Sequence, residues 1–414
     1  MERVTLGIEK FRTTPPNWIK KVRIGLLANQ ASVDPHFKHT QKTVFELAGK
    51  NLRALFVPQH GIRGELQANM VESEDSVEPG LKIPIFSLYS PLTRIPTEEM
   101  LDEIDVLLID LQDVGVRVYT FATTMGLCLE AAAKHGKKVI VLDRPNPIGA
   151  ERVEGNILKK KLRSFVGFSS LPMRHGMTMG ELALCFNEEL EEEAELEIVS
   201  MEGYRREYLF SHTGIAWVNP SPNIPTLDTT LVYPGQVLLE GTNLSEGRGT
   251  TKPFEFFGAP YIDPITLKRG LKKRRLPGVT FREISFIPQF DKWKGTLCHG
   301  FQLHVTDPET FKPYYTTLAV IQEVMKKWPQ EFKWRPPPYE YEFEWLPFDI
   351  IAGDEDIRKG LEEKRDVEEM EATWTKGLKD FIVRKEKYLL NVLPELRLRH
   401  RRQRIPRILA LDRR

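Results

Sequence analysis

Apolar runs of strand length alternate with stretches of helical periodicity through the first 150 residues. This alternation limits the fold, because two parallel strands need a crossover between them and the crossover is usually a helix. The apolar runs are residues 22–28, 52–57, 83–89, 105–110 and 137–142, and amphipathic stretches occur at 40–48 and 119–134. The pattern therefore predicts an α/β fold with a mostly parallel sheet covered by helices.

The chain has 414 residues, which is enough for two domains of ordinary size. Beyond Asn223 it changes to short apolar runs punctuated by Pro and Gly, alternating with helical stretches, as is typical of an α+β domain. We expect an N-terminal domain over residues 1–224 and a smaller C-terminal domain over 225–390. Residues 391–414 are expected to form an Arg-rich tail, because eight arginines lie between 394 and 414.

Charge and hydropathy exclude several classes of function. The 59 Lys and Arg residues balance 58 Asp and Glu residues, so the chain lacks the positive field that non-specific nucleic-acid binding needs. It has no apolar run long enough for a transmembrane segment, and its N-terminus lacks the apolar core of a secretion signal. The chain as written is therefore expected to be cytoplasmic, or extracytoplasmic if a leader has been removed.

Familiar cofactor and metal motifs are missing from the sequence. The first strand is not followed by G-x-G-x-x-G, which disfavours a dinucleotide, and neither a P-loop nor H-E-x-x-H occurs. The three cysteines lack C-x-x-C spacing, so a zinc knuckle is not indicated either. We expect neither a cofactor nor a metal.

Polar residues follow four of the predicted strands. Ligands of open α/β sheets bind at the carboxyl ends of the strands, so these residues are candidates for a site. The alternative is that they only cap helices and form turns. The candidates at this edge are Asn29, Gln59, His60, Arg63, Glu65, Asp110, Asp113, Arg144 and Asn146.

The densest group of polar side chains lies in the block 239–255. Three glycines there stand among hydroxyl, amide, carboxyl and guanidinium groups, of which Glu240, Asn243, Glu246 and Arg248 are the main candidates. Such a mixture suits a polyhydroxylated, partly anionic ligand such as a sugar acid. The block could instead be an exposed turn.

Seven motifs together resemble the NamZ family, also known as the DUF1343 domain. They are Gly25–Gln30, Val57–Gly64, Asp110–Thr120, Leu142–Pro147, Arg174–Thr178 with Gly180–Ala183, Pro220–Asn223 and the 239–255 block, in the family's order. The resemblance covers about residues 4 to 390. It implies a Rossmann-like N-terminal domain, a barrel-like C-terminal domain and an active cleft between them. It also implies an exo-β-N-acetylmuramidase that removes terminal N-acetylmuramic acid from peptidoglycan fragments, and it adds Arg117, His175 and Asn223 to the substrate-binding candidates.

One departure from the family bears on the chemistry. Family members usually have glutamate where this chain has Gln59, and by resemblance that glutamate is the general acid/base. An amide cannot exchange a proton, so the resemblance predicts ligand binding with slow turnover. Otherwise another carboxyl group takes over the role, and the candidates are Glu65, Asp113, Glu240 and Glu246.

Two other functions are also compatible with the sequence. The chain could be a non-catalytic relative that binds muropeptides or amino sugars, since one fold hosts different functions. It could also be a phosphosugar or nucleotide-sugar enzyme that uses the same cleft. If the substrate is N-acetylmuramic acid, an arginine should bind its lactyl carboxylate, and the candidates are Arg63, Arg144 and Arg248.

Overall fold

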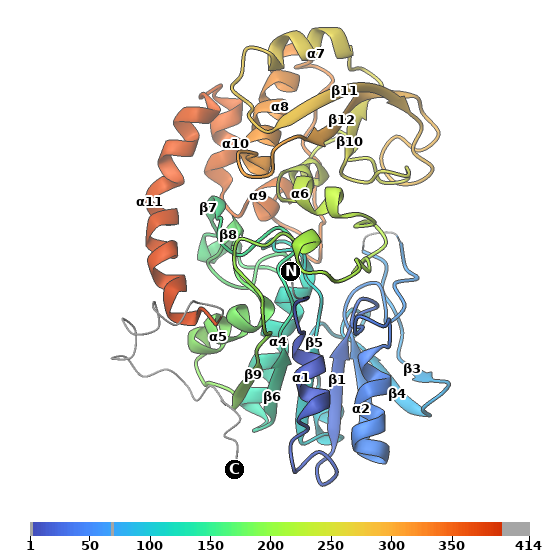
Figure 1. The fold of residues 1–414 in the computed structure, drawn as a ribbon. Helices are drawn as coiled ribbons and strands as arrows, with labels where there is room; N and C mark the ends of the chain where they lie inside the picture. The colour runs from blue at the N-terminus through green and yellow to red at the C-terminus, as the bar shows by residue number, and fades with distance from the viewer. Residues whose placement is uncertain (1–2, 68–69, 391–414) are drawn as a thin grey trace.

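A seven-stranded sheet with the order β3-β4-β2-β1-β5-β6-β9 forms the N-terminal part of the computed structural model (Figure 1), which describes residues 3–67 and 70–390. All neighbouring strands are parallel except the β3–β4 pair. The strands are β1 (Ile24–Ala28), β2 (Leu52–Val57), β3 (Ser76–Glu78), β4 (Ile83–Ser87), β5 (Val106–Asp110), β6 (Lys138–Leu142) and β9 (Leu196–Val199). The mostly parallel sheet expected from the sequence is thus confirmed.

Helices cover both faces of this sheet because its inner strands are apolar on both faces. Leu26 and Leu108 belong to the core beneath α1 and α2, whereas Leu27 and Ile109 belong to the core beneath α4 and α5. Thr97 caps α3 by accepting a hydrogen bond from the Met100 backbone N–H. The helices of this part are α1 (Gly7–Thr13), α2 (Thr40–Ala48), α3 (Glu98–Asp102), α4 (Thr120–Lys134) and α5 (Met179–Glu189), with the 3₁₀ turns η1 (Gly49–Asn51), η2 (Lys160–Leu162) and η3 (Phe210–His212).

The C-terminal part is built on an antiparallel sheet with the order β10-β12-β11. The sheet is three-stranded and open, where the resemblance implied a barrel-like domain, and helices pack against it. Its strands are β10 (Phe256–Ala259), β11 (Val279–Phe286) and β12 (Cys298–Val305). Its helices are α6 (Leu227–Gln236), α7 (Pro264–Leu271), α8 (Pro313–Lys327), α9 (Pro347–Ala352) and α10 (Glu355–Glu362), with the 3₁₀ turn η4 (Val237–Gly241).

The long helix α11 (Val367–Lys385) runs alongside both parts of the molecule (Figure 1). It packs against α8 and against β7 (Glu154–Ile157), which pairs with β8 (Pro172–Arg174). It continues into η5 (Glu386–Tyr388), which contacts α5. The Arg-rich tail expected at 391–414 lies outside the described residues.

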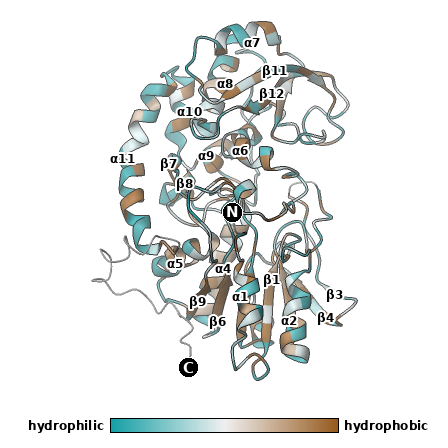
Figure 2. Cartoon of the chain, in the orientation of Figure 1, coloured by the Kyte–Doolittle hydropathy of each residue, from teal (hydrophilic) through white to brown (hydrophobic). Residues whose placement is uncertain are grey.

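Apolar residues are concentrated in the strands of the main sheet, while polar residues are frequent along the outer helix α11 (Figure 2). Within the described part of the chain, none of the helices combines the length and the apolar character that crossing a membrane requires. The expected break at residue 224/225 falls in the loop before α6.

Candidate active site

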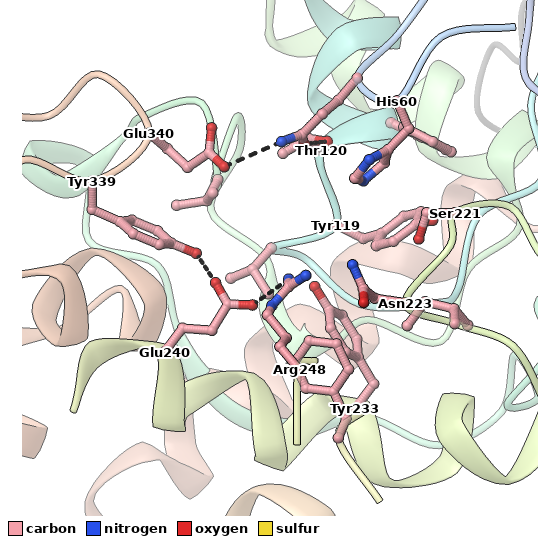
Figure 3. A pocket seen from close by; sticks show the side chains of 16 residues that line it. His60, Tyr119, Thr120, Ser221, Asn223, Tyr233, Glu240, Arg248, Tyr339 and Glu340 are labelled. Carbon is pink, nitrogen blue, oxygen red and sulfur yellow. Dashed lines mark hydrogen bonds and ion pairs between the residues drawn. The ribbon is translucent and has the colours of Figure 1, made fainter. Parts of the chain in front are cut away.

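A pocket lies where loops from the N-terminal and C-terminal parts meet (Figure 3). The space inside it, counting its open mouth, is about 430 Å³. Its polar lining residues are Gln59, His60, Tyr119, Thr120, Ser221, Asn223, Tyr233, Glu240, Arg248, Tyr339 and Glu340. The lining thus combines residues that follow β2, residues at the start of α4, and residues of the C-terminal part.

Gln59 enters the pocket because β2 ends at Val57 and the loop that follows carries its side chain inward. The Thr120 hydroxyl donates a hydrogen bond of 3.0 Å to Gln59 Oε1. This bond orients the side-chain amide, so that its Nε2 donates to Glu340 Oε1 at 3.4 Å. Gln59 is therefore held between the two parts of the chain.

His60 is buried beside Gln59, and its backbone is in the left-handed region with φ of 79°. Its Nδ1 lies 2.6 Å from the Leu66 carbonyl oxygen, which can only accept a hydrogen bond, so Nδ1 carries the proton. Burial lowers the pKa of His60 to about 4, and the ring is therefore neutral at pH 7. Its Nε2 is an acceptor that a ligand hydroxyl can use.

Glu240 lies in η4 and is held by an ion pair and by a tyrosine. Arg248 Nη2 donates to Glu240 Oε1 at 2.7 Å, and the Tyr339 hydroxyl donates to Oε2 at 2.5 Å (Figure 3). Burial opposes ionisation of Glu240, but Arg248 and Tyr339 outweigh it and keep the Glu240 pKa below its ordinary value. Glu240 is therefore a carboxylate at neutral pH.

Glu246 lies behind Arg248, away from the lining of the pocket. Its Oε1 is 3.4 Å from Arg248 Nε, and its Oε2 is 2.5 Å from Lys292 Nζ. Lys292 also donates to the Leu239 carbonyl at 2.8 Å. Glu246 and Lys292 thus support Arg248 from outside the pocket.

Glu340 is the second carboxyl group of the lining, and its side chain is only 3% exposed. The Tyr89 hydroxyl donates to Glu340 Oε2 at 2.7 Å, while Gln59 contacts Oε1. Burial, reinforced by the nearby negative charge of Glu240, raises the pKa of Glu340 to about 7. Two carboxyl groups whose pKa values are shifted in opposite directions therefore line one pocket.

Four buried polar atoms of the lining have no hydrogen-bond partner among the residues that the structure describes, and two of these are the Tyr119 hydroxyl and Arg248 Nε. The other two are the Arg248 Nη1 donor and the Asn223 Oδ1 acceptor. Asn223 is oriented by its Nδ2, which donates to the Gln67 carbonyl at 2.7 Å. Because buried polar groups are nearly always paired, these two atoms are suited to bind a polar ligand.

Three of the predicted residues at the strand ends, Asn29, Asp110 and Arg144, lie outside the pocket lining. Arg144 donates to Asp110 Oδ1 at 2.5 Å and to Oδ2 at 2.9 Å, and Thr40 also donates to this carboxylate. Asn29 donates to the Gln112 carbonyl at 3.0 Å and accepts from Ser32 at 2.9 Å. We call Asn29, Ser32, Thr40, Asp110 and Arg144 the strand-end cluster. Its side chains bind one another and nearby backbone carbonyls.

Arg117 and Asn146 bind backbone rather than the pocket. Arg117 is fully buried and donates to four carbonyls, including those of Ile351 and Ala352 in α9, so it joins the two parts of the chain. Asn146 donates to the Met177 carbonyl at 3.0 Å.

Asp113 and His175 form a small buried cluster of their own. Asp113 Oδ2 accepts from the Gly115 N–H at 2.6 Å and lies 3.9 Å from His175 Nε2. His175 Nδ1 accepts from the Met177 N–H at 3.2 Å. Neither residue lines the pocket.

The remaining candidates lie on the surface or in loop contacts. Arg63 is largely exposed, with its guanidinium 3.8 Å from Glu78, and Glu65 is exposed. Asn243 accepts from the Tyr261 hydroxyl at 2.9 Å and donates to the Glu331 carbonyl at 2.8 Å. None of these three candidates lines the pocket.

Sequence reasoning missed Tyr339 and Glu340. They follow three prolines in the segment 336–345, in which aromatic and acidic residues alternate. This pattern carries no motif for catalysis, and only the fold brings it next to Gln59. Over the described residues, there is no cluster of His, Cys, Asp or Glu that could hold a metal ion.

The fold and the pocket define a two-domain α/β protein with a carboxyl-lined site between its parts. Residues 24–228 match the family described as exo-beta-N-acetylmuramidase NamZ, N-terminal, and residues 231–390 match its C-terminal counterpart. The chain belongs to the NamZ family.

Known proteins that resemble this chain cover nearly all of it. It is 42% identical over 388 residues to the peptidoglycan beta-N-acetylmuramidase NamZ of Bacillus subtilis (strain 168), covering 94% of this chain and 91% of that one. Two crystal structures of DUF1343 family proteins from Bacteroides fragilis NCTC 9343 share the fold. One has a TM-score of 0.84 at 34% identity, the other 0.72 at 26%, and each match covers 94% of this chain and 99% of the other.

Proposed function

We propose that this protein is a glycosidase that releases N-acetylmuramic acid from the non-reducing ends of peptidoglycan fragments. The observation that carries the proposal is that one pocket holds two buried carboxyl groups, Glu340 with a raised pKa and Glu240 with a lowered one. Glycoside hydrolysis normally requires such a pair, one group to protonate the leaving oxygen and one to assist at the anomeric centre. The similarity to a peptidoglycan muramidase supports the same substrate class.

Arg248 is the residue that we assign to the lactyl carboxylate of the substrate. Of the three arginines considered from the sequence, Arg63, Arg144 and Arg248, only Arg248 lines the pocket. Its Nη1 donor is unpaired within the described chain and can bind an anionic oxygen. Asn223 Oδ1 and the neutral His60 ring supply acceptors for the amide and hydroxyl groups of the sugar.

Gln59 bears on how fast the reaction runs. An amide at this position cannot exchange a proton, so turnover is expected to be slow unless another carboxyl group serves. The retained pocket supports binding in either case. The Gln59→Glu variant, described in the Discussion, tests whether Gln59 slows the reaction.

The proposal is tested with chromogenic β-glycosides of N-acetylmuramic acid and N-acetylglucosamine. The wild-type chain should hydrolyse the muramide with the higher kcat/KM, since only the muramide carries the carboxylate that Arg248 can bind. Calorimetry with the free sugars should give the same order of affinity. Binding of the muramyl sugar without turnover would instead identify a binding protein, and equal activity on both sugars would contradict the assignment of Arg248.

A further inference from the structure

We infer that Glu340 is the catalytic acid of this site and that Gln59 is a positioning residue that holds its carboxyl group. The inference rests on the proposed function and names the group that performs its proton transfer. It differs from the expectation from the sequence, which placed that role at position 59 or at Glu65, Asp113, Glu240 or Glu246.

The positions of the other carboxyl groups leave Glu340 as the acid. Among the carboxyl groups of the residues that the structure describes, only those of Glu240 and Glu340 line the pocket. Glu240 is ionised, and both of its oxygens are engaged, by Arg248 and by Tyr339. Glu246 lies behind Arg248 and pairs with Lys292. A general acid must hold a proton before the bond breaks, and of the two lining carboxyl groups Glu340 is the one whose pKa is raised, chiefly by burial.

The two oxygens of Glu340 differ in how tightly they are bound. Oε2 accepts a short bond of 2.7 Å from Tyr89, whereas Oε1 has, among the described residues, only the 3.4 Å contact from Gln59. Oε1 is therefore the less constrained oxygen and the one suited to carry the proton. Because Thr120 fixes the Gln59 amide, the NH₂ group faces Oε1 and the amide oxygen faces away from it.

The surroundings of Glu340 raise its pKa to about 7. Burial is the largest influence and the Glu240 carboxylate adds to it, while the hydrogen bonds from Tyr89 and Gln59 and the charge of Arg248 oppose it. Burial also keeps the nearby His60 neutral. An amide at position 59 adds no charge, whereas a carboxylate there would compete with Glu340 for the proton.

The backbone at Glu340 supports a functional role. Glu340 and Tyr341 are consecutive non-glycine residues in the left-handed region, with φ of 46° and 67°. Such residues persist only where the surrounding structure holds them, and they are frequent at active sites. Here Arg94 stacks over the Tyr341 ring at 3.4 Å, and the Tyr341 hydroxyl donates to Glu72 at 2.8 Å.

The proposed proton transfer needs only Glu340 and a water molecule, and no cofactor. Glu340 transfers its carboxyl proton to the glycosidic oxygen while the bond from that oxygen to the anomeric carbon breaks and its electron pair stays on the oxygen. The released fragment leaves as an alcohol. A water molecule then adds its oxygen to the anomeric carbon and gives up one proton, so that Glu340 is protonated again at the end of the cycle.

The Glu340→Gln variant tests this role with two substrates that differ in their need for an acid. A sugar leaving group must be protonated, whereas dinitrophenolate leaves without help. We expect Glu340→Gln to lower kcat on the MurNAc–GlcNAc disaccharide about 10²- to 10⁴-fold, and to lower it far less on the dinitrophenyl muramide. The exposed Glu344 of the same loop provides the control, and Glu344→Gln should match wild type on both substrates.

The outcomes separate this inference from the proposed function. Wild-type turnover that survives in Glu340→Gln on the disaccharide would overturn the role of Glu340 and leave the proposed function standing. Equal losses on both substrates, with weakened muramyl-sugar binding by calorimetry, would overturn it in favour of a structural role. If the wild-type chain hydrolyses neither substrate, the proposed function fails, and the role of Glu340 fails with it.

Discussion

Two buried polar clusters lie close to the carboxyl ends of the main sheet, and they differ in how completely they are paired. In the strand-end cluster, the Arg144 guanidinium donates hydrogen bonds to both oxygens of Asp110 and to the Val33 carbonyl. In the pocket cluster, defined as Gln59, His60, Glu240, Arg248 and Glu340, Arg248 contacts the Glu240 and Glu246 carboxylates but keeps Nη1 unpaired within the described chain. The difference indicates that a density of polar residues does not by itself mark a site, whereas unpaired polar atoms beside open space do.

The largest effect on stability should come from breaking the strand-end cluster. Arg144→Met leaves the fully buried Asp110 carboxylate without its counter-ion, and we expect the free energy of unfolding to fall by about 3–5 kcal/mol. Urea denaturation measures this change. The control is Arg23→Met at the exposed pair with Asp105, which should cost at most about 1 kcal/mol. If Arg144→Met were as stable as wild type but lost sugar selectivity, the strand-end cluster would belong to the site.

A smaller effect is expected in the pocket cluster, on selectivity rather than stability. Arg248→Lys keeps the positive charge beside Glu240 but loses the planar fork that a carboxylate needs. We expect the preference for muramic acid over glucosamine, as a ratio of kcat/KM values, to fall about 10- to 100-fold, the scale of a hydrogen bond to a charged group. Arg63→Ala, on the surface, should leave the ratio unchanged. The reverse pattern would assign the lactyl carboxylate to Arg63.

The sequence predicts the fold better than it predicts the site, for a physical reason. Periodicity and turn residues are local, so the runs at 105–110 and 119–134 correspond closely to β5 and α4. The pocket instead joins Gln59 to Glu340, 281 residues further along the chain. Local patterns also cannot show whether a polar residue such as Asp110 is paired in the fold. Three residues from the family motifs, Gln59, Asn223 and Arg248, do line the pocket together.

The smallest effect on turnover is expected for Gln59→Glu, which changes the residue that contacts Glu340 in the pocket cluster. Gln59→Glu places a second carboxyl group against Glu340, so the two groups must share a proton and their coupled titration shifts upward. Turnover at neutral pH should stay the same or fall, as kcat on a chromogenic muramide would show. A gain of about 10²-fold would instead mean that position 59 carries the lost acid and that Gln59 slows the wild-type chain.

The pH dependence of kcat/KM tests the central claim most directly, because it reports the essential acid of the free enzyme. Burial raises the pKa of Glu340 to about 7, and the protonated form is the active one. For the wild-type chain on the disaccharide, kcat/KM should therefore be level at lower pH and fall about tenfold for each pH unit above that value. Glu344→Gln should keep this decline, and the residual activity of Glu340→Gln should lose it. A decline that persists unchanged in Glu340→Gln would contradict the account and assign the acid to another group.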